Sequence, residues 1–194
     1  GSGHLTRALA IAAQLPSDEV VFLGSSLETY KDLIPKGIRS IVLPFDIPAN
    51  SDRDWAASDL SFLHYAPVNV KGIINRNYLI TEFFAKHNHC LLFVDVSVEI
   101  TLLARLCGIP TVVVRQHGNR SDLAHLMAYE SASFVLAPYA KTMAQDIESD
   151  FAHKTFYSGG FSKYSGMSIE DNTSADDQIA MFFGRGGTCF DWKL

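Results

Sequence analysis

The chain has 194 residues, of which 47% are hydrophobic, and a formal net charge of −5. This length and apolar content allow a sizeable buried core, while the acidic balance offers no basic stripe for a nucleic-acid backbone and so disfavours nucleic acid as a partner. No apolar stretch reaches the roughly 20 residues that cross a bilayer, and no signal peptide is visible, so we expect a soluble, cytoplasmic protein.

The first stretch, GSGHLTRALAIAAQL, combines a glycine-containing start with a helical pattern. Apolar side chains recur at helical spacing from Leu5 to Leu15, which predicts an amphipathic helix. Gly1, Gly3 and His4 are therefore expected on a loop at its N-terminus, where free N–H groups and the helix dipole favour an anion. Such a loop normally follows a strand, so we expect the sequence to lack its true N-terminus and first strand.

Six short, continuously apolar runs follow and predict buried strands of a parallel sheet. Helical patterns separate them, with Ser97 and Ser121 as expected N-caps of two helices. Strands alternating with helices predict a Rossmann-like, doubly wound α/β domain, whose ligands bind outside the carboxyl ends of the strands. The predicted strands span 19–25, 39–45, 90–96, 111–116, 133–139 and 154–160, and helical patterns are found at 26–34, 97–110, 121–132 and 140–151.

Polar segments divide the chain. Residues 46–59 are turn-rich and predict a surface loop, and the acidic stretch 165–177 has the composition of a linker. We therefore expect one domain over 1–164, and a short start of a second α/β domain over 178–194. Between residues 55 and 84, aromatic and aliphatic side chains exceed what one buried helix face needs, which indicates either an exposed patch for a hydrophobic acceptor or membrane surface, or a loop folded over the core.

The three cysteines show no paired C-x-x-C spacing. Cys90 and Cys107 lie in apolar segments, which predicts reduced cysteines in the core. We expect no disulfide framework.

The first candidate site joins the N-terminal stretch to the end of the third predicted strand. Asp95 stands at the carboxyl end of that strand, on the same rim as His4, so the two side chains could meet. A histidine oriented by an aspartate is a competent general base near neutral pH. Two alternatives stay open: His4 and the glycines only form a turn and cap, or Asp95 only caps the next helix.

The second candidate site is the segment RQHGNRSD between a strand and a helix, which could hold a phosphate or a sugar hydroxyl at the binding rim. A solvated loop with ion pairs to Asp122 is the alternative. Two further motifs carry little weight: D-R-D at 52–54 lies in the polar loop, and H-N-H at 87–89 lacks further ligands and suits a helix C-terminus, so no metal site is expected. The candidate substrate-binding residues are Gly1, Ser2, Gly3, Arg7, Arg115, Gln116, His117, Gly118 and Arg120.

The combination of G-S-G-H, D-V-S-V-E and R-Q-H-G-N-R, with Y-S-G-G-F-S-K-Y before the linker, resembles the N-terminal half of GT-B glycosyltransferases. The similarity covers most of residues 1–164 and is greatest to the family of the peptidoglycan N-acetylglucosaminyltransferase. The resemblance implies two Rossmann-like domains facing a cleft, of which the first holds the acceptor and the second the nucleotide-sugar.

The resemblance further implies inverting, metal-independent transfer of a sugar, such as N-acetylglucosamine, to an acceptor hydroxyl, with no cofactor beyond the nucleotide-sugar substrate. His4 would be the base and Asp95 its partner, by analogy with plant and natural-product relatives. The acceptor would be a glycan or lipid-linked molecule, with peripheral contact at the inner face of the membrane. With the donor half absent from the sequence, we expect these 194 residues to transfer no sugar. A sugar-nucleotide epimerase, a non-catalytic half-transferase subunit and a plain binding module remain alternatives.

Overall fold

The computed structural model describes residues 2–57, 59–162 and 164–165. Gly1, Cys189, the predicted linker beyond Ser165 and the predicted second-domain start at 178–194 lie outside this part of the chain. Within it, strands and helices alternate from the N-terminus to residue 157. The chain is therefore an α/β protein, as the sequence predicts.

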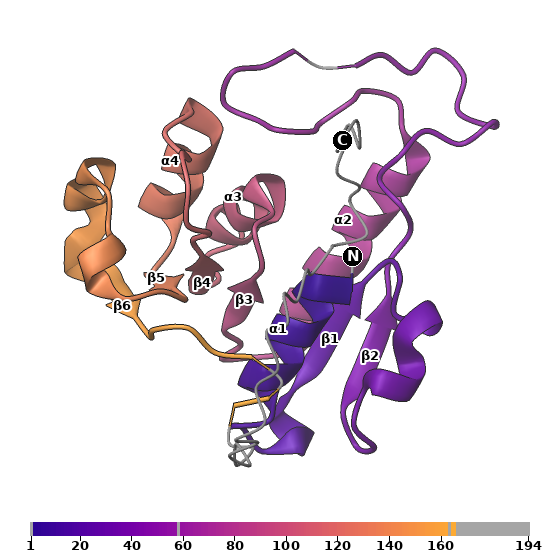
Figure 1. The fold of residues 1–194 in the computed structure, drawn as a ribbon. Helices are drawn as coiled ribbons and strands as arrows, with labels where there is room; N and C mark the ends of the chain where they lie inside the picture. Colours follow the sequence, from indigo (N-terminus) through magenta and orange to yellow (C-terminus); the bar gives the residue numbers. More distant parts are fainter. Residues whose placement is uncertain (1, 58, 163, 166–194) are drawn as a thin grey trace, which may run out of the picture.

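All six predicted strands are confirmed, and every pairing between them is parallel. They form two separately hydrogen-bonded sheets, of order β1-β2 and β3-β4-β5-β6, where the sequence predicts one continuous sheet. Figure 1 shows β1 and β3 as the neighbouring members of the two sheets. The strands are β1 Val21–Gly24, β2 Arg39–Val42, β3 Leu92–Val94, β4 Thr111–Val114, β5 Phe134–Ala137 and β6 Thr155–Tyr157.

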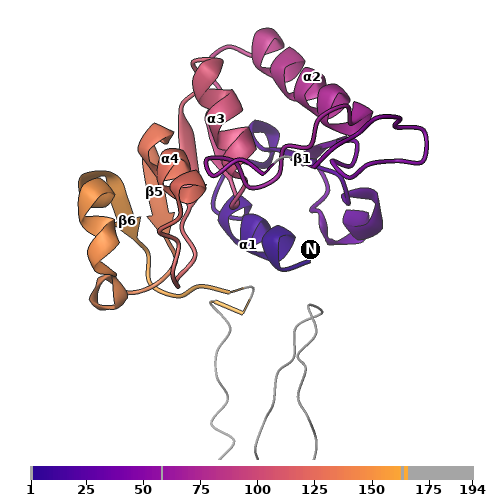
Figure 2. The same ribbon diagram turned by 90° about the horizontal axis from the view of Figure 1, so that it is seen from above.

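Four α-helices pack against these strands. Figure 2 shows α1 on one side of β1, and α2 and α3 on the other. This placement on both sides of the strands is compatible with the layering of a doubly wound fold. The helices are α1 Ser2–Ala12, α2 Lys71–Lys86, α3 Val98–Leu106 and α4 Leu123–Ser131.

One apolar cluster connects the two sheets. Its buried members include Ile80 and Phe84 of α2 and Ala104 of α3. Leu23 of β1 and Leu92 of β3 both pack against it. Because the two sheets share this cluster, burial of apolar surface holds them together where no backbone pairing does.

A second cluster forms the core of the four-stranded sheet. Val94, Val113 and Val135 come from three adjacent strands, and Tyr129 and Phe151 cover them from α4 and the segment that precedes β6. These valines fit the pleated, doubly covered position that β-branched residues favour. The carboxyl ends of β3, β4 and β5 are thereby fixed relative to one another.

Two predicted helices are wrong in type. The segment at 26–34 forms a 3₁₀ helix, η2 Glu28–Leu33, and Tyr30 interrupts its helical dihedrals. Ile34 is extended, because the residue before a proline avoids the α region. The segment at 140–151 is split by the extended Ala144 into the 3₁₀ helices η3 Lys141–Met143 and η4 Asp146–Lys154, and η1 Ser17–Glu19 is a further 3₁₀ turn.

The helix caps agree with the sequence at one of two positions. Ser97 caps α3, where its Oγ accepts from the Ile100 N–H, and this prediction is confirmed. The predicted Ser121 cap is wrong, because the Asp122 side chain accepts from the His125 N–H and caps α4. Ser121 donates to Asn119 instead. A carboxylate at this position also complements the helix dipole.

The cysteine predictions are also met in part. Cys90 is half-buried and packs against the cluster that connects the sheets. Cys107 follows α3 and is exposed, so its predicted place in the core is wrong. Among the described residues, no helix combines the length and the apolar character needed to cross a membrane.

Candidate functional site

The side chains of His4 and Asp95 meet at the carboxyl end of β3. His4 and Arg7 lie one turn apart on α1, and Asp95 follows the last residue of β3 directly. Nδ1 of His4 is 3.3 Å from Oδ2 of Asp95, and Nη1 of Arg7 donates to Oδ1 at 2.9 Å. The predicted proximity of His4 and Asp95 is therefore confirmed, and the structure adds Arg7 to the pair. The catalytic role of the cluster stays a prediction.

The Asp95 carboxylate is more buried than its histidine partner. The Asp95 side chain is 12% exposed and that of His4 49%. Oδ2 is buried and is not aligned for a hydrogen bond with any described side chain or backbone group. A polar oxygen in this condition favours a partner that donates to it. A small rotation of the half-exposed His4 ring would supply that donor.

Asp95 does not cap a helix, which removes one of its two open interpretations. Ser97 performs that function for α3. Between them, Val96 has a φ of +78°. The left-handed region is unusual for any side chain and costly for a β-branched one. Strained residues of this kind concentrate at functional sites, where the surrounding structure over-determines them.

The N-terminal stretch differs from the prediction in its backbone. Gly3 and His4 lie within α1 and not on a loop before it. Gly3 does not have a positive φ, so its backbone adopts a conformation that other residues can also adopt. The first N–H groups of α1 still lack intrahelical acceptors, so they keep the donor character on which the prediction depends. Gly1 and the side chain of Ser2 lie outside the described parts of the structure.

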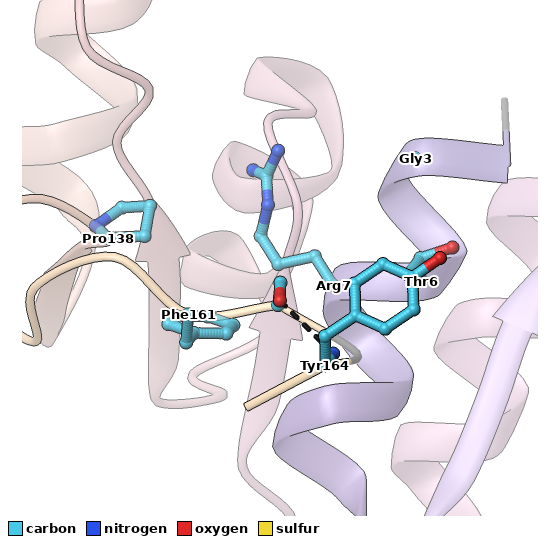
Figure 3. A pocket seen from close by; sticks show the side chains of 7 residues that line it. Gly3, Thr6, Arg7, Pro138, Phe161 and Tyr164 are labelled. Atoms are coloured by element: carbon cyan, nitrogen blue, oxygen red, sulfur yellow. Dashed lines mark hydrogen bonds between the residues drawn. The ribbon is translucent and has the colours of Figure 1, made fainter. Parts of the chain in front are cut away.

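A cavity of about 360 Å³ adjoins the cluster. Figure 3 shows this cavity between α1 and the segment that follows β6, with Pro138 on the side opposite α1. The size is within the range of small-molecule pockets. Its lining combines apolar rings with a guanidinium and hydroxyls, from Gly3, Thr6, Arg7, Pro138, Phe161, Ser162 and Tyr164.

The predicted binding loop after β4 divides into buried and exposed parts. Arg115 is fully buried, and its guanidinium donates to the Gln116 carbonyl and to Gln145 Oε1, both at 3.0 Å. It also lies over the ring of Tyr129. Burial and these bonds direct Arg115 into the protein, because a guanidinium there needs acceptors on several sides. Whether Arg115 contacts a substrate stays a prediction.

The remaining loop residues stay near the surface. Arg120 donates to Gln116 Oε1 at 3.2 Å, and the exposed His117 ring contacts Tyr139 edge-on. Gly118 has a φ of +116°, so the turn that presents His117 needs a glycine. The alternative interpretation expected ion pairs between this loop and Asp122. Among the described residues, Asp122 pairs with His64 and His125 instead. Whether Gln116, His117, Gly118 and Arg120 contact a substrate stays a prediction.

A second polar cluster at the N-terminus of α4 was not predicted. Asp122 lies between His64, whose Nε2 is 3.1 Å from Oδ1, and His125, whose Nδ1 is 2.6 Å from Oδ2. Burial opposes ionisation of Asp122, but hydrogen bonds from His125 and His64 outweigh it and lower the pKa of Asp122 to about 2. Burial lowers the pKa of His125 despite its aspartate partner. The D-x-x-H spacing at 122–125 was the only local signal for this cluster, since His64 belongs to a distant loop.

The strands and the His4 cluster define an α/β protein with a polar site at the carboxyl edge of a parallel sheet. Comparisons with protein-family models, with curated proteins and with solved structures found no match for this chain.

Proposed function

We propose that this chain is the acceptor-binding half of an inverting glycosyltransferase of the GT-B type. The single observation that supports it most is the cluster of His4, Asp95 and Arg7 beside an open cavity. An oriented imidazole next to a pocket is the arrangement needed to deprotonate a bound hydroxyl. The proposal also rests on the sequence resemblance given above.

In this proposal His4 accepts the proton of the acceptor hydroxyl. Asp95 orients the imidazole and stabilises its protonated form. The oxygen then attacks the anomeric carbon of the donor sugar, and the nucleoside diphosphate leaves with the bonding electrons. Arg7 donates to Oδ1 of Asp95 and leaves Oδ2 on the side of His4. Contacts with both Arg7 and His4 would keep the carboxylate in a fixed orientation.

The lining of the cavity fits a sugar ring. Phe161 and Tyr164 offer apolar rings, and Thr6 and Ser162 offer hydroxyls. Sugar-binding sites need both, because a sugar has apolar C–H faces and polar hydroxyl edges. We place the acceptor here, with a nucleotide-sugar donor entering from a facing domain. Nucleic acid is not proposed as a partner.

The order of the strands supports the Rossmann-like part of the proposal. In a doubly wound sheet of order 3-2-1-4-5-6, the first strand lies between the second and the fourth. The two sheets, β2-β1 and β3-β4-β5-β6, follow this order if one further strand position lies between β1 and β3. A strand before α1 would join the two sheets through that position.

A hydrophobic or lipid-linked acceptor is supported by the apolar side chains between β2 and the middle of α2. Phe45, Ile47, Trp55, Ile74 and Tyr78 are all about half exposed or more. Single exposed apolar residues are ordinary, but a contiguous patch of them is typical of an interaction surface, and we propose that these side chains contribute to one. We propose peripheral contact with a membrane through this segment, which agrees with a cytoplasmic protein acting at the inner face.

The proposed function is tested by assaying the full-length protein with a panel of nucleotide-sugars and lipid-linked or soluble acceptors. Transfer of the sugar with inversion of the anomeric centre supports the proposal. Conversion of the nucleotide-sugar without an acceptor indicates an epimerase instead, and acceptor binding without turnover indicates a non-catalytic subunit. Either of these outcomes overturns the transferase assignment.

A further inference from the structure

Three side chains that can ligate metals meet where the long loop between β2 and α2 approaches α4. His64 comes from the loop, which Figure 1 shows arching above α2 and toward α4. Asp122 is the N-cap of α4, and His125 lies in its first turn. One potential ligand atom from each of the three lies within 4.8 Å of the other two. We propose that His64, Asp122 and His125 bind a divalent transition-metal ion of the zinc type.

The ligand chemistry favours this class of metal. Two imidazole nitrogens and one carboxylate oxygen are a common ligand set for zinc, whereas calcium and magnesium prefer oxygen alone. Three protein ligands leave a fourth tetrahedral position to water or to a bound anion. The site is separate from the His4 cluster in its residues, so it does not depend on the proposed function.

The distances are close to those that a bound ion requires. Ligands of tetrahedral zinc stand about 3.3 Å apart, since each metal–ligand bond is about 2.0–2.1 Å. His64 Nε2 is 3.1 Å from Oδ1 of Asp122, and His125 Nδ1 is 2.6 Å from the other carboxylate oxygen, Oδ2. The ring centroids of His64 and His125 are 4.1 Å apart, edge to face. Modest rotation of the half-exposed His64 ring is enough to enclose an ion.

The backbone around the site is held without the metal. Glu99 of α3 accepts from the N–H groups of His64 and Tyr65 at 2.7 and 2.8 Å. This contact fixes the loop next to α3, while the N-terminus of α4 holds Asp122. His125 is almost fully buried, so its ring has little freedom. A site that is largely preformed loses less entropy when it binds.

Ion binding would replace the hydrogen bonds within the cluster. His64 Nε2 and His125 Nδ1 would each offer a lone pair to the ion, with the remaining proton of each neutral ring on its other nitrogen. Asp122 would contribute one carboxylate oxygen. The loop would then be joined to α4 by coordination bonds, which predicts a higher melting temperature with metal.

The test is Zn²⁺ titration of the chelator-treated chain by calorimetry, with Co²⁺ absorption as a report on coordination geometry. We expect one equivalent to bind and the four-coordinate Co²⁺ spectrum to appear. His64→Ala and Asp122→Asn are each expected to weaken binding by about 100-fold or more. Asparagine is a good N-cap, so Asp122→Asn removes the charge of the ligand while keeping the helix start.

The matched control is His153→Ala, which removes an exposed histidine elsewhere in the chain and should leave Zn²⁺ affinity unchanged. Circular dichroism in the presence of chelator establishes that each variant is folded. Equal Zn²⁺ affinity in the parent, His64→Ala and Asp122→Asn proteins would overturn the proposal, as would the absence of a bound equivalent in the parent. In either case the three residues form only a hydrogen-bonded network.

Discussion

The His4 imidazole, on the first turn of α1, lies 3.3 Å from the Asp95 carboxylate at the end of β3. This contact joins two segments that lie far apart in the sequence. His4 is half exposed, while Asp95 is largely buried. In the proposed function this arrangement would leave the base accessible and enclose its partner.

Replacing His4 tests whether this contact is catalytic. In the full-length protein we expect His4→Ala to lower kcat by about 10²- to 10⁴-fold with donor affinity nearly unchanged, because a positioned base contributes on that order. Asp95→Asn should lower kcat less, since the base remains. Sugar-transfer kinetics and thermal melting are measured together. A well-folded His4→Ala protein with kcat within a few-fold of the parent would exclude His4 as the base.

Val96→Gly tests the strain beside Asp95. Glycine adopts a φ of +78° without penalty, and a strained residue costs about 1–3 kcal/mol. We expect the free energy of unfolding to stay equal or to rise by about 1 kcal/mol, measured by urea denaturation. Val112→Gly is the matched control in β4, where loss of a valine from a regular strand should destabilise. If Val96→Gly lowered the free energy of unfolding as much as Val112→Gly does, the strain at Val96 would not be significant.

Gly72 is expected to tolerate no side chain. A Cβ at this position would lie 1.8 Å from the carbonyl oxygen of Phe45, which is backbone and cannot rotate away. Gly72→Ala should therefore lower the free energy of unfolding by about 1–3 kcal/mol or more, as overpacking does.

Gly3 is the matched control for Gly72, because each is the second residue of an α-helix. A Cβ at Gly3 would meet nothing within 4 Å. Gly3→Ala should leave stability equal or slightly higher. Chemical denaturation of both variants is the measurement. Equal effects at the two glycines would contradict the close approach of Phe45.

The Asp122 cluster predicts acid sensitivity of the metal-free protein. The pKa of His125 is lowered from its ordinary value of 6.5, so below pH 6.5 the unfolded chain binds the proton more readily and stability falls. The pKa of Asp122 is lowered from 3.8 to about 2, so its contribution is present above pH 3.8 and is lost as the pH falls through about 2.

Urea denaturation in the presence of chelator, repeated from pH 8 to pH 2, measures the pH-dependent contributions of both His125 and Asp122 to stability. The Asp122→Asn protein should lose the component between pH 3.8 and 2, because an amide does not titrate in this range. If parent and variant showed the same change in stability over that interval, the low pKa of Asp122 would be contradicted.

Membrane contact is tested by flotation with liposomes of neutral lipid. We expect the parent to float and the double variant Ile47→Ser, Trp55→Ser to float less, because both apolar side chains are about half exposed in the proposed contact segment. Leu106→Ser is the control, since Leu106 is the most exposed apolar side chain of α3. Absence of flotation by the parent would count against a membrane-associated acceptor.

The sequence by itself determined the local structure where apolar periodicity was strong. All six strands and the Ser97 cap of α3 follow from patterns a few residues long, because strand burial and capping depend on near neighbours. The 3₁₀ segments were missed because a short amphipathic pattern does not distinguish them from an α-helix.

The tertiary structure decided which side chains meet and which are buried. Nothing local shows that Arg115 is enclosed among Gln145 and Tyr129, or that His64 reaches Asp122 from another part of the chain. The contact of His4 with Asp95 was expected only because parallel strands end on the same edge of a sheet, and the addition of Arg7 depended on the rotation of α1 about its axis. Long-range contacts of this kind are set by the packing of whole elements, which local sequence patterns do not reveal.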